Sequence, residues 1–204
     1  MKRIASLLAA TLSLAVVSAA LAAPEVGQPA PDFTLTDISG KSHSLSSLKG
    51  QTVILEWVNP ECPFVVKHYD KSGNMPATQK AATADGVVWF SINSAAPGKQ
   101  GDYNPAKAEA WMTRVKAAPT AYFRDQDGKV GKLYDARTTP HMFVINPQGV
   151  LVYAGGIDDI RSADADDIAK ATNFVKAALA DLKSGKDVQT KTSRPYGCSV
   201  KYAD

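Results

Sequence analysis

The stretch that decides the fold is QTVILEWVNPECPFVVKHYD, residues 51–70. Residues 53–58 form an apolar run that a single acid, Glu56, interrupts, which predicts a buried strand. Cys62 follows this run, and Pro63 suits the first turn of a helix. A second apolar run over 87–92 is expected as the next strand, so the sequence predicts a parallel strand–helix–strand crossover.

The segments on either side predict an α/β fold with a mixed central sheet, helices on both faces and an N-terminal hairpin. The helix after Pro63 is expected to break near Gly73 and to resume over 77–84. Turn signals predict two hairpins, one of 32–36 with 41–45 and one of 142–145 with 150–153. Cap and periodicity signals predict two further helices, over 105–117 and 162–184. Residues 186–204 form a polar tail, and no internal repeat is visible.

The first 22 residues have the pattern of a secretory signal peptide. Lys2 and Arg3 precede an apolar stretch that ends in Ala20-Leu21-Ala22, a small-x-small cleavage site. An uncleaved membrane anchor is the alternative, although small residues dominate the stretch. We expect a signal peptide (1–22), a folded domain (23–185) and a tail that carries Cys198 (186–204). The mature chain is then expected in the periplasm, without stable membrane insertion.

Composition and charge exclude several classes of protein. The chain has 204 residues, of which 45% are hydrophobic and 21% charged, as in ordinary globular proteins. The formal charge of +3 falls to +1 without Lys2 and Arg3. Because nucleic-acid binding depends on clustered Lys and Arg, and no such cluster occurs, we expect no nucleic-acid partner.

Cys62 is the strongest candidate for chemistry. At a helix start the free backbone amides carry partial positive charge, which favours thiolate over thiol and lowers the thiol pKa. A thiolate is the nucleophile in disulfide exchange. The alternatives are that Cys62 is a small buried apolar residue or half of a static disulfide.

Three polar side chains lie close to Cys62 in the sequence. A buried acid at Glu56 would have a raised pKa and suit proton transfer, and the alternative is a solvated Glu at an edge. Lys67 is expected on a solvated helix face, and His68 is interpreted as structural.

Short motifs spread over residues 25–204 resemble the thioredoxin-like superfamily, and within it the peroxiredoxin-like redoxins of the alkyl hydroperoxide reductase/thiol-specific antioxidant group. They are Ala30-Pro31-Asp32-Phe33, Leu48-Lys49-Gly50, Trp57-x4-Cys62-Pro63, Thr139-Pro140, Asn146-Pro147-Gln148-Gly149 and Gly197-Cys198-Ser199-Val200-Lys201-Tyr202.

The resemblance implies a thioredoxin fold and assigns roles to site residues. Cys62 takes the place of the first cysteine of Cys-x-x-Cys, and Glu56 that of a buried acid. Pro140 takes the place of a cis-proline that faces the cysteine, which would leave the Thr139 backbone free to pair with an extended substrate peptide. Thr139, Pro140, Pro63 and Trp57 are therefore the expected substrate-binding residues.

The sequence departs from the family at two motifs. Position 65 is Val, so Cys62 has no partner thiol within the loop. The peroxidatic motif Pro-x-x-x-Thr-x-x-Cys is also absent, because Leu55 and Asn59 occupy the corresponding positions. Peroxide cleavage needs donors arranged on the O–O bond. A thiol peroxidase therefore remains an alternative to disulfide exchange.

Cys198 is the only other cysteine and so the only internal candidate to resolve a mixed disulfide on Cys62. Three interpretations stay open: a pair that cycles between thiol and disulfide, a permanent disulfide, or two thiols too far apart to bond. A permanent disulfide across so long a loop would stabilise the fold by about 5 kcal/mol in the chain-entropy model.

A copper-binding module and a non-catalytic binding domain are the remaining alternatives. His141 and Met142 follow Pro140 and, with Cys62 and His68, offer the soft sulfur and imidazole ligands that copper prefers. These residues lack a recognised metal-ligand spacing, so we expect no metal and no cofactor. The sequence as a whole predicts an exported thiol–disulfide oxidoreductase that acts on protein or small-molecule thiols and disulfides.

Overall fold

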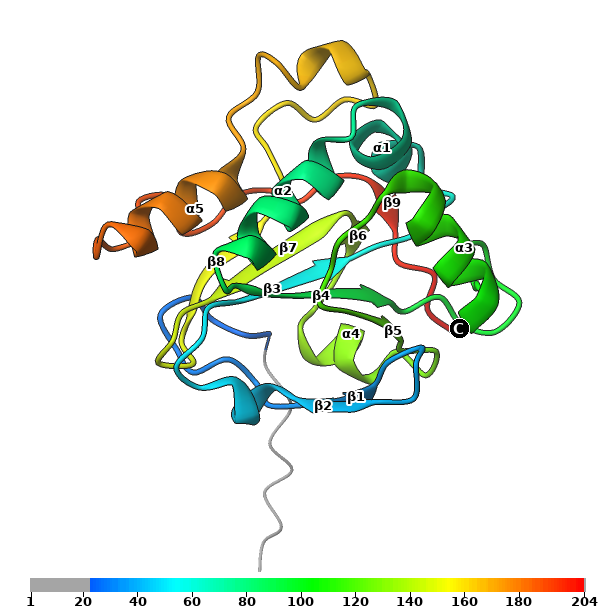
Figure 1. Cartoon of the computed structure of the whole chain (residues 1–204), viewed down its shortest axis with the longest axis horizontal. Helices are drawn as coiled ribbons and strands as arrows, with labels where there is room; N and C mark the ends of the chain where they lie inside the picture. The colour runs from blue at the N-terminus through cyan, green and yellow to red at the C-terminus, as the bar shows by residue number, and fades with distance from the viewer. Residues whose placement is uncertain (1–22, 204) are drawn as a thin grey trace, which may run out of the picture.

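A mixed sheet of five strands, in the order β5–β4–β3–β7–β8, forms the centre of the computed structural model, which describes residues 23–203 (Figure 1). The predicted signal peptide lies outside the described residues. The strands are β3 (Val53–Trp57), β4 (Val88–Asn93), β5 (Ala121–Arg124), β7 (His141–Ile145) and β8 (Leu151–Gly155). β3, β4 and β5 run parallel, and β7 runs antiparallel to both β3 and β8.

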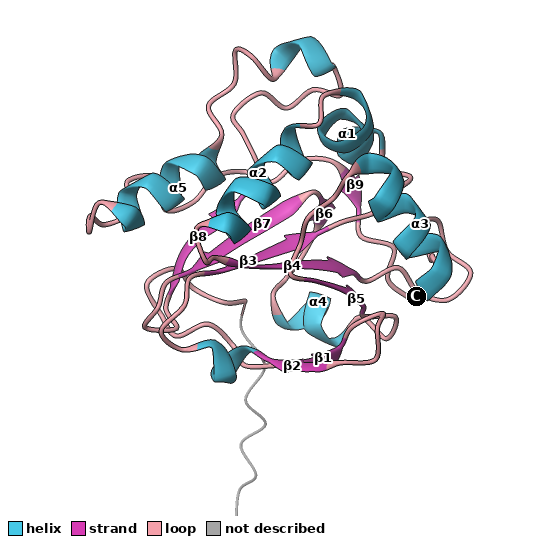
Figure 2. Cartoon of the chain, in the orientation of Figure 1, coloured by secondary structure: helices cyan, strands magenta, loops and turns pink. Residues whose placement is uncertain are grey.

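Helices cover both faces of this sheet, as the sequence predicted (Figure 2). One face carries α1 (Pro63–Val66) with the π-turn Lys67–Lys71, α2 (Asn74–Ala84), α3 (Pro105–Val115) and α5 (Phe174–Lys183). The other face carries α4 (Lys129–Leu133), the 3₁₀ turn Leu45–Leu48, and the N-terminal hairpin of β1 (Thr34–Thr36) and β2 (Ser42–Ser44).

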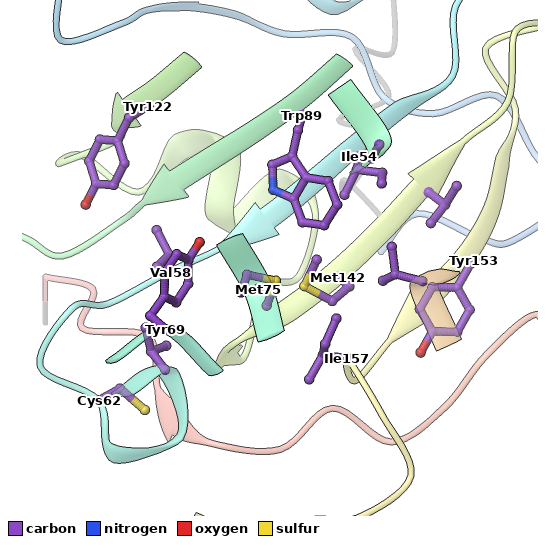
Figure 3. Packing of buried hydrophobic residues seen from close by; sticks show 14 of the residues in the cluster. Ile54, Val58, Cys62, Tyr69, Met75, Trp89, Tyr122, Met142, Tyr153 and Ile157 are labelled. Carbon is purple, nitrogen blue, oxygen red and sulfur yellow. The ribbon is translucent and has the colours of Figure 1, made fainter. Parts of the chain in front are cut away.

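The central strand β3 divides the core into two apolar clusters. All five of its residues are buried, as expected for a strand with a covered layer on each side. Ile54 belongs to the cluster under α1, α2 and α3, and Leu55 and Trp57 belong to the cluster on the α4 side. Figure 3 shows that the first cluster extends to Cys62 at the end of the sheet.

Local signals in the sequence position the helices around Cys62. Cys62 is the extended N-cap residue of α1, and Pro63 is in its first turn. The chain turns at Gly73, whose φ of +63° suits glycine, and α2 starts directly after it, three residues earlier than predicted. The Asn104 side chain caps α3 by accepting a 2.8 Å hydrogen bond from the Lys107 amide.

The prediction of one helix over 162–184 is wrong. Only α5 is α-helical there, and residues 165–167 form a separate 3₁₀ turn. Side chains accept hydrogen bonds from backbone amides that a continuous helix would need for its own bonds. Asp164 accepts from the Asp166 amide, and Asp159 accepts from the Thr172 amide. The Asn173 side chain then starts α5 by accepting from the Lys176 amide.

Sequence analysis also missed β5, α4 and the structure of the tail. The last residues return to the main body, where β9 (Cys198–Ser199) pairs antiparallel with β6 (Thr138–Thr139). Among residues 23–203, no helix is both long and apolar enough to cross a membrane.

Candidate functional site

Cys62 lies just beyond the carboxyl end of β3, where the chain enters α1 (Figure 3). Its amide donates a 3.0 Å hydrogen bond to the Asn59 carbonyl, and its carbonyl accepts the first helical bond from the Val66 amide at 2.9 Å. These two bonds fix the backbone on either side of the sulfur. The residue is 0% exposed, so its sulfur is wholly covered.

The Cys62 sulfur is held between β6 and β9. Its thiol donates to the Thr139 carbonyl at 3.0 Å, and the Cys198 amide donates to the sulfur at 3.4 Å. In the β6–β9 ladder Thr139 lies opposite Cys198. The structure therefore brings both cysteines and Thr139 together, although 136 residues separate Cys62 from Cys198. Both cysteines are free thiols here.

The two thiols have opposite electrostatic surroundings. Burial raises the pKa of Cys62, but hydrogen bonds from Cys198, the Thr139 side chain and the Val65 amide outweigh burial, and the net effect lowers the pKa. The pKa of Cys198 rises to about 11 because of burial, its hydrogen bond to Cys62 and the charge of Cys62. Cys62 is thus the thiol that ionises first, and the Val65 amide contributes through the free donors of a helix start.

Pro140 lies beside this pair, and the Thr139–Pro140 peptide bond is cis, as the resemblance implied. Gly197 approaches the same point from β9 with a φ of +133°. A Cβ atom on Gly197 would lie 2.0 Å from the Thr139 carbonyl oxygen, so only glycine allows the tail to pass this closely.

Glu56 is fully buried under α2, and the solvated alternative is wrong. Its carboxylate accepts from the Tyr69 hydroxyl at 2.7 Å, and from side chains of Gln79, Trp89 and Ser91 at 2.8–3.1 Å. Burial raises the pKa of Glu56 in spite of these four donors. Cys62 is not among its hydrogen-bond partners in the described chain. The shared neighbour is Tyr69, which packs in the same cluster as Cys62.

The other two predicted substrate-binding residues have different positions. Pro63 is exposed at the rim of the site, directly after Cys62. Trp57 is 0% exposed on the opposite face of the sheet, where its indole donates to Ser94 at 3.0 Å and packs against Tyr134 and Phe143. The structure therefore does not bring Trp57 to the site.

The expectation that Lys67 is solvated is wrong, because Lys67 and His68 are both 0% exposed. The segment around Asp158 folds over them: Lys67 Nζ lies 4.0 Å from Asp158 Oδ2 and donates to the Ile160 carbonyl at 3.3 Å. Burial and the charge of Lys67 lower the pKa of His68 to about 3, so His68 is neutral.

Tyr196 connects this buried group to the tail, and sequence analysis missed it. Its hydroxyl donates to Asp158 and lies 3.2 Å from His68 Nε2, and its ring meets the ring of Phe64. Burial raises the pKa of Asp158, whose Oδ2 accepts no hydrogen bond from the described residues. The one available signal was that Tyr196 and Tyr202 are the two aromatic residues of a mostly polar tail.

The residues weighed as copper ligands do not form a cluster. Met142 is 0% exposed in β7 as a core residue, and His141 accepts from the Arg137 amide at 3.3 Å. Within residues 23–203 no group of three or more His, Cys, Asp or Glu side chains is arranged to hold a metal ion.

The sheet order, the strand–Cys62–helix junction and the cis-Pro140 loop define the class: a thioredoxin-like redoxin. The model of the AhpC/TSA family matches residues 26–154. This chain belongs to the AhpC/TSA family.

The chain is similar in sequence to one curated relative and in fold to several solved structures. The thiol-disulfide oxidoreductase ResA of Bacillus subtilis is 30% identical over 126 residues, which is 62% of this chain and 64% of ResA, so the chain spans less than two thirds of that relative. A hypothetical protein from Sinorhizobium meliloti has a TM-score of 0.74 at 23% identity, over 89% of this chain and 97% of that one. An uncharacterized conserved protein from Geobacillus kaustophilus has a TM-score of 0.72 at 26% identity, over 88% and 93%.

Proposed function

We propose that this chain is an exported thiol–disulfide oxidoreductase, with Cys62 as the nucleophile and Cys198 as the resolving cysteine. The observation that carries the proposal is the contact between the two residues, in which the Cys198 amide donates to the Cys62 sulfur at 3.4 Å. The lowered pKa of Cys62 and the raised pKa of Cys198 support a division of roles between them. The similarity to ResA, itself described as a thiol-disulfide oxidoreductase, points the same way.

The proposed exchange has two steps. The Cys62 thiolate attacks one sulfur of a substrate disulfide, so a Cys62–substrate disulfide forms, the substrate S–S bond breaks, and one substrate thiolate leaves. Cys198 then gives up its proton and attacks the Cys62 sulfur, which forms a Cys62–Cys198 disulfide and releases the second substrate thiolate. The substrate gains two electrons and the protein loses two, and an external dithiol is needed to restore the protein.

Other site residues would assist this exchange. Glu56, with its raised pKa, would hold the proton that the site exchanges, and Tyr69, which donates to Glu56, packs in the same cluster as Cys62. Thr139, Pro140 and Pro63 surround Cys62 and would position the substrate. The substrates would be protein or small-molecule disulfides, with no cofactor.

The proposal includes export and the division of the chain. The signal-like pattern at 1–22 favours passage across the inner membrane to the periplasm, where disulfide chemistry is common. The redox domain would then comprise residues 23–185, and residues 186–204 would serve it by presenting Cys198.

Disulfide exchange is favoured over peroxide reduction. Leu55 and Asn59 stand where the peroxidatic motif would have its Pro and Thr, and Val65, which is 1% exposed in the apolar cluster, offers no second thiol in the loop. A thiol peroxidase would need Cys62 to act without the donors that cleave an O–O bond. Peroxide consumption in the presence of a dithiol measures this alternative directly.

The test is stoichiometric exchange of the reduced protein with bis(2-hydroxyethyl) disulfide, followed by mass spectrometry. The intact protein should form a Cys62–Cys198 disulfide and release two equivalents of mercaptoethanol. Cys198→Ser should stop at a mixed disulfide on Cys62, and Cys62→Ser should give neither product. A Cys198→Ser protein with no adduct on Cys62 after prolonged incubation would overturn the proposal.

A further inference from the structure

The edge of β6 is occupied by the protein's own C-terminal segment (residues 196–202). Within this segment β9 runs antiparallel to β6, with Thr138 opposite Ser199 and Thr139 opposite Cys198. The pairing continues on one side, where the Val200 amide donates to the Arg137 carbonyl at 3.0 Å. An extended polypeptide that adds to this edge as a strand would use the same backbone groups.

Tyrosines anchor the C-terminal segment at both of its ends. Tyr196 is buried, and its hydroxyl donates to Asp158. The Tyr202 hydroxyl donates to the Ala136 carbonyl at 2.7 Å, and its ring lies so close to Gly131 that a Cβ there would be 2.4 Å from the hydroxyl oxygen. Figure 1 shows the segment in red, crossing the end of the sheet beside β6.

This arrangement controls which sulfur is accessible. Cys62 is 0% exposed and has the Cys198 amide on its sulfur, whereas Cys198 itself is only partly buried. An outside disulfide therefore meets Cys198 first, and it cannot approach Cys62 in line while the C-terminal segment is in place. The lower-pKa thiol is the one that the segment covers.

We propose that the C-terminal segment is a built-in gate over Cys62: it must leave β6 before the Cys62 sulfur can attack a substrate disulfide. This inference rests on the proposed function and adds a regulation of its site. It also gives Cys198 a timed role, because return of the segment brings Cys198 back to the Cys62–substrate disulfide. The electrons then move as in the exchange above.

The oxidised protein reacts in the opposite sense. An external dithiol would attack the partly exposed Cys198 sulfur of a Cys62–Cys198 disulfide, and Cys62 would leave as the thiolate with the bonding electron pair. The second thiol of the dithiol then displaces Cys198 and closes a disulfide in the reductant. Reduction therefore does not require release of the segment, but attack by Cys62 does.

Gly197→Ala is the variant that weakens the packing of the C-terminal segment against β6, since the added Cβ would collide with the Thr139 carbonyl oxygen at 2.0 Å. Gly40→Ala is the matched control, because Gly40 also has a positive φ, +90°, but nothing lies within 4 Å of its added Cβ. Both changes are made in a Cys198→Ser background, so that Cys62 is the single thiol. Iodoacetamide labelling of Cys62 then reports how often the segment opens.

We expect Gly197→Ala to speed Cys62 labelling by about tenfold or more, because the rate scales with the open fraction, and Gly40→Ala to leave it unchanged. Tyr202→Ala, which removes an anchor far from the sulfur, should act in the same direction. Equal labelling rates in all these proteins would overturn the inference, provided that their urea midpoints show them folded.

Docking is tested in trans with a synthetic peptide of residues 195–202 that carries Ser in place of Cys198. We expect it to bind the Gly197→Ala and Tyr202→Ala proteins, to slow their Cys62 labelling, and not to affect the parent. Failure to protect Cys62 in either opened variant would overturn the gate. If labelling behaves as expected but bis(2-hydroxyethyl) disulfide is never reduced, the proposed function fails and the gate stands. If the disulfide is reduced but the opened variants label no faster, the gate fails and the proposed function stands.

Discussion

At the scale of single residues, the groups around each cysteine give the two thiols different pKa values. Cys62 receives hydrogen bonds from Cys198 and the start of α1, and its pKa falls. Cys198 faces the charge of Cys62 and its pKa rises to about 11. This difference is the basis of the proposed roles, in which Cys62 attacks first and Cys198 acts only after Cys62 has been consumed.

Glu56 offers a prediction on stability at this scale. Glu56→Ala removes the acceptor of four buried donors, from Tyr69, Gln79, Trp89 and Ser91. We expect the free energy of unfolding to fall by about 2–4 kcal/mol. The four donors stay buried in the variant, so they bond neither to Glu56 nor to water.

Urea denaturation measures this loss, and Ile54→Val is the matched control on the same strand. Ile54 is equally buried, but its truncation leaves no polar group unsatisfied, so it should cost about 1 kcal/mol. If Glu56→Ala costs no more than Ile54→Val, the network around Glu56 does not stabilise the fold as described.

At the scale of elements, the junction of β3 and α1 could be predicted and the return of the tail could not. Residues 53–63 carry their structure in a local pattern: an apolar run, then an N-cap position, then Pro63 in the first turn. β9 has two residues and no periodicity, and its place depends on Thr138 and Thr139, which lie about sixty positions earlier in the chain. Such pairing leaves no local signal.

Burial of Lys67 illustrates the same limit. A lysine on a short helix predicts a solvated face, and nothing near it in the sequence indicates otherwise. Asp158, more than ninety residues later, supplies the charge partner, and Ile160 supplies a carbonyl. Because both contacts come from a loop far away in the sequence, the residues around Lys67 could not indicate this burial.

The π-turn Lys67–Lys71 gives a prediction on pH. The pKa of His68 is about 3 in the folded protein, against an ordinary 6.5, so below pH 6.5 the unfolded chain takes up a proton that the folded protein refuses. The contribution of His68 to stability is therefore complete above pH 6.5 and is lost as the pH falls toward 3.

The measurement is urea denaturation of the parent and His68→Asn between pH 7.5 and 4.5. We expect the parent to lose up to about 1.4 kcal/mol per pH unit more than the variant below pH 6.5, and the two curves to run parallel above it. His141, whose burial lowers its pKa to about 4, remains in both proteins and should leave a residual slope. Parallel curves at every pH would contradict the neutral, buried His68.

At the scale of the whole molecule, the two cysteines lie where the tail contacts the main body. A Cys62–Cys198 disulfide would close a loop across 136 positions of the chain. Long loops gain the most from such closure, and we expect the oxidised protein to be more stable than the reduced protein by about 2–4 kcal/mol.

Denaturation in urea with and without a dithiol measures this difference, and Cys198→Ser serves as the control that should not respond to the dithiol. Identical midpoints for the oxidised and reduced parent, with the disulfide verified by mass spectrometry, would contradict the account. The prediction depends on the adjacency of the two residues and not on any substrate.

The central claim is that the surroundings of Cys62 favour its thiolate. The most direct measurement is a titration of thiolate absorbance in the reduced protein, read as the difference from Cys62→Ser and from Cys198→Ser. The account predicts two separate steps: one below the ordinary range of thiols that disappears with Cys62, and one near pH 11 that disappears with Cys198. A single step at the ordinary thiol pKa, common to both residues, would contradict it.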